Sequence, residues 1–174
     1  MTFNFEITVD TIVQIIGFAF AIIGIWFTYK QMKETSRVNR VKFIYDLTND
    51  LFSDNKVREF FYKIDYEKFE FRLDEKKIDK FKGSDEERWL DAILYRYDVI
   101  GRMVRTNTIP LNDIEYVLFE IIQVYKNKDV INYLKWLDGE FAIHGKLGKN
   151  KRKRAHDDFR WLAEKIQKNR LIVL

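Results

Sequence analysis

The chain has 174 residues, a formal net charge of +4, 47% hydrophobic residues and no cysteine. The lack of cysteine excludes disulfides, thiolate nucleophiles and cysteine-ligated metal sites, and an aromatic content of 16% argues against a disordered chain. With only His144 and His156, a histidine-rich metal centre is not expected either, and no glycine-rich phosphate loop or nucleophile elbow is present. We therefore expect neither a metal nor a cofactor.

Residues 11–29 carry no charge and lie between Asp10 and Lys30. At roughly 1.5 Å per residue, a helix of this length reaches about 28 Å, close to the ~30 Å hydrocarbon thickness of a bilayer. The run predicts a single transmembrane helix. It divides the chain into a short extracytoplasmic N-terminus at residues 1–10, the membrane helix, and a cytoplasmic helical domain at residues 30–174.

One side of this helix carries small or polar residues, which we call the small-residue stripe. Its members recur at alternating spacings of four and three: Asp10, Gln14, Gly17, Ala21, Gly24 and Thr28. Small residues allow two helix backbones to approach closely, which favours oligomerisation. A second interpretation is that the stripe faces the axis of a ring and lines a polar path. A third is a lone anchor in which the pattern has no role.

Basic residues follow directly after the membrane helix. We call Lys30, Lys33, Arg37 and Arg40 the basic stripe, because their spacings of three, four and three place them on one helix face. They predict that the C-terminal side is cytoplasmic, with contact to anionic headgroups. The alternative is a charged vestibule at the mouth of a pore. Helical spacing continues to about residue 52, so one long helix is expected.

The remainder of the chain predicts an all-helical domain. Asp54 or Ser53 caps a helix, residues 65–82 form a long connection with aromatic residues, and residues 84–87 form a capping box that opens a helix to about Thr106. A turn at residues 107–112 precedes a further helix, and Asn127 or Asp129 caps the next. The last helix is expected at residues 155–170. The expected core-facing residues include Tyr97, Tyr133 and Phe159.

A basic loop precedes the last helix, and its basic members are Lys146, Lys149, Lys151, Arg152, Lys153 and Arg154. Because the loop leads into His156 at a helix start, it suggests phosphate binding with a proton-transfer group, for which Arg152 and His156 are the weak catalytic candidates. The favoured interpretation is a solvated loop that contacts RNA, lipid or an acidic partner.

The order of these parts resembles the small membrane accessory protein of type VI-B CRISPR systems. The likeness covers essentially the whole chain and consists of an acidic N-terminus, one membrane helix, a basic juxtamembrane helix and a helical domain with a basic stretch near its end. It implies a divergent HEPN-like helical domain, a ring-shaped homo-oligomeric pore in the bacterial inner membrane, and a functional partnership with the RNA-guided RNase of such a system.

The HEPN nuclease pattern has an arginine, four to six residues, and then a histidine. Arg152 and His156 have only three residues between them, and at four intervening residues the position is Lys151. This departure argues against RNase activity. The leading hypothesis is therefore a non-enzymatic pore that permeabilises or depolarises the membrane in antiphage defence. The alternatives are a membrane-tethered HEPN-type ribonuclease and a membrane-anchored scaffold.

Overall fold

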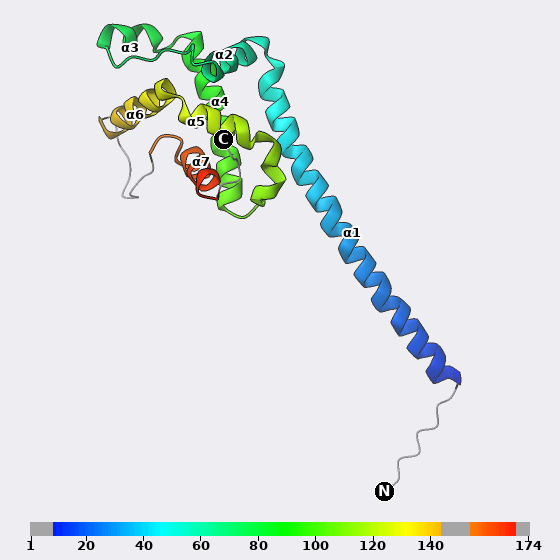
Figure 1. The fold of residues 1–174 in the computed structure, drawn as a ribbon. Coiled ribbons are helices and arrows are strands. Elements are labelled where there is room, and N and C mark those ends of the chain that lie inside the picture. Colours follow the sequence, from blue (N-terminus) through cyan, green and yellow to red (C-terminus); the bar gives the residue numbers. More distant parts are fainter. Residues whose placement is uncertain (1–8, 144–153, 170–174) are drawn as a thin grey trace. The chain divides into compact units, whose positions relative to one another are not determined.

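A computed structural model describes residues 9–143 and 154–169. All regular elements in this part of the chain are helices, in the order α1, α2, α3, α4, η1, α5, α6 and α7 (Figure 1). The expected all-helical class is confirmed for these residues. The chain forms two compact units, Met1–Arg40 and Val41–Leu174, which we describe separately.

The first element, α1, is the long helix Val9–Ser53. It is long and apolar enough to cross a membrane, and none of its most apolar window is buried within the chain. The helix does not end with the uncharged run but continues through the basic stripe to Ser53. The predicted extension to about residue 52 is thus confirmed. Ser36 lies inside this helix, where its hydroxyl accepts a hydrogen bond from Arg40 at 2.9 Å.

In the second unit, α2 spans Asn55–Asp65 and α3 spans Glu75–Phe81. The side chain of Asp54 accepts a hydrogen bond from the Lys56 amide and caps α2, which decides between the two predicted caps. The sequence left open where the aromatics of the connection pack. Phe69 and Phe71 are both buried, and the Phe71 ring lies 5.3 Å from that of Tyr133. The connection therefore forms part of the domain core.

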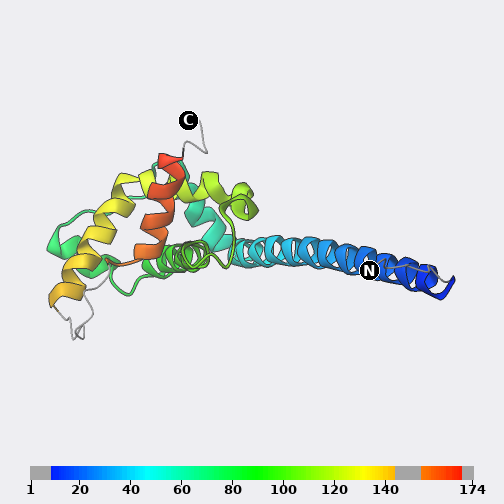
Figure 2. The same ribbon diagram turned by 90° about the horizontal axis from the view of Figure 1, so that it is seen from below.

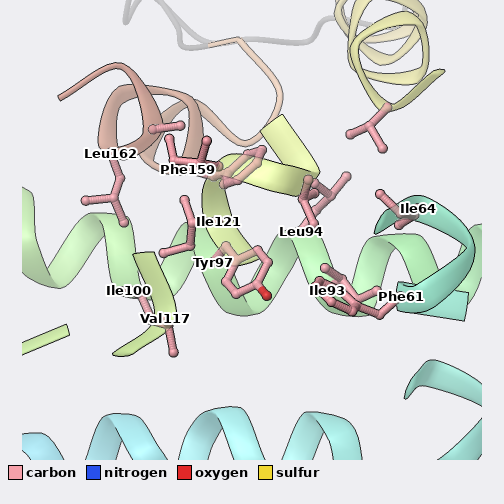
Figure 3. Packing of buried hydrophobic residues seen from close by; sticks show 14 of the residues in the cluster. Phe61, Ile64, Ile93, Leu94, Tyr97, Ile100, Val117, Ile121, Phe159 and Leu162 are labelled. Carbon is pink, nitrogen blue, oxygen red and sulfur yellow. The ribbon is translucent and has the colours of Figure 1, made fainter. Parts of the chain in front are cut away.

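The central helix of the domain is α4, Asp85–Arg105, which packs against α2 and α7 (Figure 1). It begins at Ser84, whose hydroxyl accepts a hydrogen bond from the Glu87 amide, as the capping box predicts. Its buried face includes Tyr97, which stacks on Phe159 of α7 with ring centroids 6.0 Å apart. Figure 3 shows side chains from α2, α4, α5 and α7 meeting around Tyr97.

The helix predicted after Pro110 is divided into two elements. A 3₁₀-helix, η1, spans Leu111–Val117, and an α-helix, α5, spans Leu118–Lys126. The backbone of Ile114 is non-helical, with φ −112° and ψ 15°, although the residue is fully buried. The next helix, α6, spans Lys128–Ile143, and the side chain of Asn127 accepts hydrogen bonds from the Asp129 and Val130 amides at its start.

The last described helix, α7, spans Asp157–Lys168 and contacts both α4 and α5 (Figure 2). It is shorter than the predicted 155–170, because His156 has a left-handed backbone at its start. Its approach to α4 is close. A Cβ atom added to Gly101 of α4 would lie 2.2 Å from the carbonyl oxygen of Asp158, a distance that no real Cβ contact shows. Glycine at position 101 therefore allows the two backbones to touch.

We predict that Gly101→Ala destabilises the domain, because the added methyl forces α7 away from α4. Overpacking of this kind costs about 1–3 kcal/mol, so the melting temperature should fall by several degrees. Gly139→Ala in α6 is the matched control, since a Cβ there meets no atom within 4 Å and alanine has the higher helix propensity. Thermal unfolding of the detergent-extracted protein, followed by tryptophan fluorescence, checks both changes. Equal stability of the two variants would contradict the close contact.

Candidate functional site

The first candidate site is the small-residue stripe of α1. All six members, Asp10 to Thr28, are exposed within the chain, and so are the bulky side chains around them. Gly17 and Gly24 have no neighbouring atom within 4 Å of an added Cβ. Unlike Gly101, these glycines are not required by any contact of the described chain. The space beside these two glycines is therefore open to a neighbouring molecule.

The stripe also forms a shallow concavity. It is lined by three residues of the stripe and three bulkier neighbours: Ala21, Gly24, Thr28, Ile25, Tyr29 and Met32. The Thr28 hydroxyl donates a 2.9 Å hydrogen bond to the Gly24 carbonyl of its own helix. This bond satisfies the hydroxyl hydrogen inside the helix and lowers the cost of placing the side chain at membrane depth. The concavity can accept an apolar surface such as a second helix.

The basic stripe lies just beyond. The Lys30 ammonium is 5.5 Å from the centre of the Trp26 ring, a cation–π distance, and Arg37 lies 3.9 Å from Glu34. Lys30, Lys33 and Arg37 are exposed and Arg40 is half-buried. Ion pairs as exposed as that of Arg37 contribute little to stability. Lys30, Lys33 and Arg37 therefore place exposed positive charge directly after the uncharged run.

The second candidate site, the basic loop with His156, is only partly described. Lys146, Lys149, Lys151, Arg152 and Lys153 lie outside the described residues, and so does the candidate pair of Arg152 with His156. Arg154 is described and exposed, and its guanidinium lies 3.4 Å from both Asp157 and Glu164. Arg154 thus pairs with carboxylates at and within α7.

His156 begins α7 in a left-handed conformation, with φ 49° and ψ 48°, and makes no side-chain capping bond. Such a backbone is strained for a non-glycine residue. Burial lowers the pKa of its imidazole below the usual range, although the nearby carboxylates of Asp98, Asp91 and Asp138 act in the opposite direction. Arg160 adds to the lowering. Burial therefore favours the neutral form of the imidazole.

Carboxylates from other helices perform the capping that His156 does not. One oxygen of Asp98 in α4 accepts hydrogen bonds from the Asp158 and Phe159 amides at 3.0 and 3.1 Å. Asp138 in α6 accepts from the Ala155 amide at 2.7 Å and from the Arg160 guanidinium at 2.8 Å. Since free amides at a helix start attract negative charge, these contacts fix the start of α7 on α4 and α6.

Two arginines of α4 complete the network. Asp158 is 2% exposed, and its carboxylate accepts hydrogen bonds from Arg102 at 3.1 Å and Arg105 at 2.8 Å. The Arg105 guanidinium also lies 5.5 Å from the centre of the Trp161 ring. Charges of both signs are therefore matched inside the network. It holds the fold together and presents no unpaired basic surface to a phosphate.

Five residues of this network were not predicted from the sequence: Asp98, Asp138, Arg102, Arg105 and Arg160. One signal was available, because Asp98, Arg102 and Arg105 share a face of the α4 pattern at spacings of four and three. Nothing local indicated that this face meets the start of α7. Within the described residues, no cluster of histidine and carboxylate side chains could hold a metal ion.

Comparison of the chain with protein-family models, with curated proteins and with solved structures finds no match. The function is therefore inferred from the two candidate sites themselves.

We predict that stability falls on acidification below pH 6.5 partly because of His156. Its folded-state pKa lies below the unfolded value, so the unfolded chain binds the proton first and stability is lost as the pH falls from about 6.5 toward the folded pKa. His156→Asn removes the titrating group while asparagine tolerates the left-handed backbone. Melting temperatures measured between pH 5 and 7.5 should depend less on pH in this variant. An unchanged pH dependence would show that His156 is not desolvated.

Proposed function

We propose that the chain is a non-enzymatic, single-pass protein of the bacterial inner membrane. Its copies assemble through the small-residue stripe of α1 into a homo-oligomeric pore. The N-terminus lies outside and the helical domain in the cytoplasm. By permeabilising or depolarising the membrane, the pore strengthens the antiphage defence of a type VI-B CRISPR system and acts with its RNA-guided RNase.

The observation that carries this proposal is the empty space beside Gly17 and Gly24 on an exposed apolar helix. Lipid tails give helices no hydrophobic reason to associate, so close backbone packing between small residues is a main driving force. A lone anchor has no need of glycine there, because glycine lowers helix propensity by about 1 kcal/mol relative to alanine. The concavity from Ala21 to Met32 offers the corresponding contact surface.

A polar path within such an assembly is supported by Gln14. Its side-chain amide is exposed, and the described chain gives it no hydrogen-bond partner. An unpartnered amide at membrane depth is costly unless it meets water or a neighbouring helix. A ring with Gln14 near its axis provides both. The basic residues after Tyr29 support the orientation, because positive charge is retained on the cytoplasmic side.

The surroundings of His156 favour the pore over a ribonuclease. Three carboxylates, those of Asp91, Asp98 and Asp138, act on its imidazole, and Asp98 and Asp138 are engaged by amides and a guanidinium of the segment around α7. The nearby guanidinium of Arg160 is engaged by Asp138 and by the Leu134 carbonyl. The departure of Arg152 and His156 from the HEPN nuclease spacing therefore fits a helical domain that has a structural and regulatory role in the pore.

We predict that Gly17→Leu and Gly24→Leu each abolish assembly, because a leucine side chain fills the space that a neighbouring backbone would occupy. Ala19→Leu is the matched control: it adds comparable bulk, but at roughly 100° per residue position 19 lies about 180° from the centre of the stripe. The mass of the detergent-extracted particle and dye release from vesicles are the measurements. We expect at least tenfold slower release from the glycine variants and unchanged release from Ala19→Leu.

The proposal is contradicted if the glycine variants keep the parental mass and release, or if Ala19→Leu is equally damaging. The two alternatives have their own outcomes. Cleavage of RNA by the purified protein, lost in His156→Ala, would support the ribonuclease. Normal defence after exchange of residues 9–29 for an unrelated membrane helix would support the scaffold.

A further inference from the structure

The unbroken helix α1 fixes the angle between its two stripes. At roughly 100° per residue, the small-residue stripe and the basic stripe point about 160° apart around the helix axis. Because α1 has no break between Val9 and Ser53, this angle is kept across the end of the uncharged run. The basic stripe therefore lies on the opposite side of the helix from Gly17 and Gly24.

The side of the helix that carries the basic stripe has the composition of a lipid-facing surface. Within the uncharged run, the same direction holds Ala19 and three bulky aliphatic residues that are exposed, Ile12, Ile15 and Ile22. Trp26 follows, in cation–π contact with Lys30, and the four basic residues come next. Aliphatic residues, then tryptophan, then positive charge is the order found where a helix leaves a bilayer.

The reach of the basic stripe also fits the membrane surface. Arg40 lies about 15 Å beyond Lys30 along the axis, at roughly 1.5 Å per residue. Side chains on a helix lean toward its N-terminus, so the long lysine and arginine side chains point back toward the bilayer. The potential of anionic lipids extends beyond the headgroups by a Debye length of about 8 Å. All four charges can therefore interact with lipid.

We propose that Lys30, Lys33, Arg37 and Arg40 form a binding surface for the headgroups of anionic phospholipids on the outside of the assembly. The polar path through the proposed pore, which we call the passage, is then lined by none of these four charges. In the direction of the small-residue stripe, α1 continues instead with the uncharged side chains of Gln31 and Thr35, and the first charged residue in that direction is Lys42. The basic stripe sets which lipids surround the protein and leaves the charge selectivity of the passage unchanged. The effect on charge selectivity rests on the proposed pore, whereas lipid binding requires only the membrane helix.

Trp26 provides a reporter of bound lipid, because it lies on the same side as the basic stripe. The full-length protein is reconstituted in vesicles of phosphatidylcholine with a minority of phosphatidylglycerol, with bromine placed on the acyl chains of one lipid or the other. Quenching that is lost in Trp26→Phe belongs to Trp26. We expect phosphatidylglycerol to be enriched at Trp26 by at least about threefold over its share of the bilayer.

Replacing the four residues of the basic stripe with glutamine should abolish this enrichment. The matched control replaces Lys76, Lys77, Lys80 and Lys82, exposed residues in and just after α3, with glutamine and removes the same charge. Enrichment should persist in that control. Absence of enrichment in the parent protein, its persistence in the basic-stripe variant, or its loss in the α3 control would overturn the lipid-binding proposal.

The current measured across planar bilayers under a salt gradient tests whether the basic stripe lies on the outside of the assembly. We expect the same reversal potential for the parent and the basic-stripe variant. A shift toward cation selectivity in the variant would overturn the outward placement and show that the stripe lines the passage. If neither protein carries current, the pore of the proposed function fails, while the quenching result still decides on lipid binding.

Discussion

The uncharged side chains of α1 cannot remain in water, and the rest of the account depends on this constraint. From Ile12 to Tyr29 the bulky residues are exposed, and none of the most apolar window is covered by the chain itself. At about 25 cal/mol per Å² of apolar surface, leaving such a helix in water costs far more than the marginal stability of a small domain. A bilayer covers the isoleucine-rich side well. The glycine side gives lipid little surface to pack against and suits another helix better.

The cytoplasmic domain proposed here is organised around the contact between α4 and α7. Gly101 permits the backbones to meet, Asp98 accepts the first amides of α7, and Asp158 binds two arginines of α4. These interactions use nearly all the charge that surrounds His156. The lowered pKa of its imidazole and its left-handed backbone follow from the way that α7 is held. In the proposed function, the contacts between copies lie in the membrane helix rather than in this domain.

Much of this architecture can be predicted from local sequence. The uncharged run predicts a helix long and apolar enough to cross a membrane, and capping residues such as Ser84 and Asn127 mark helix starts that the structure confirms. Hydrophobic spacing identifies Tyr97 and Phe159 as core residues but cannot separate a 3₁₀ turn from an α-helix. The division of the helix at Ile114 was therefore missed. Gly101 and Asp98 act through contacts with residues more than fifty positions away, and no local pattern encodes those.

The most direct test uses the natural absence of cysteine. Single cysteines placed in turn from position 14 to position 28 can be joined between copies by a short bis-maleimide in intact membranes. If copies assemble through the small-residue stripe, cross-linking rises and falls with the helical period and is highest at positions 14, 17, 21, 24 and 28. Cross-linking that is strongest at positions 15, 19, 22 and 26, or absent throughout, would contradict assembly through the small-residue stripe.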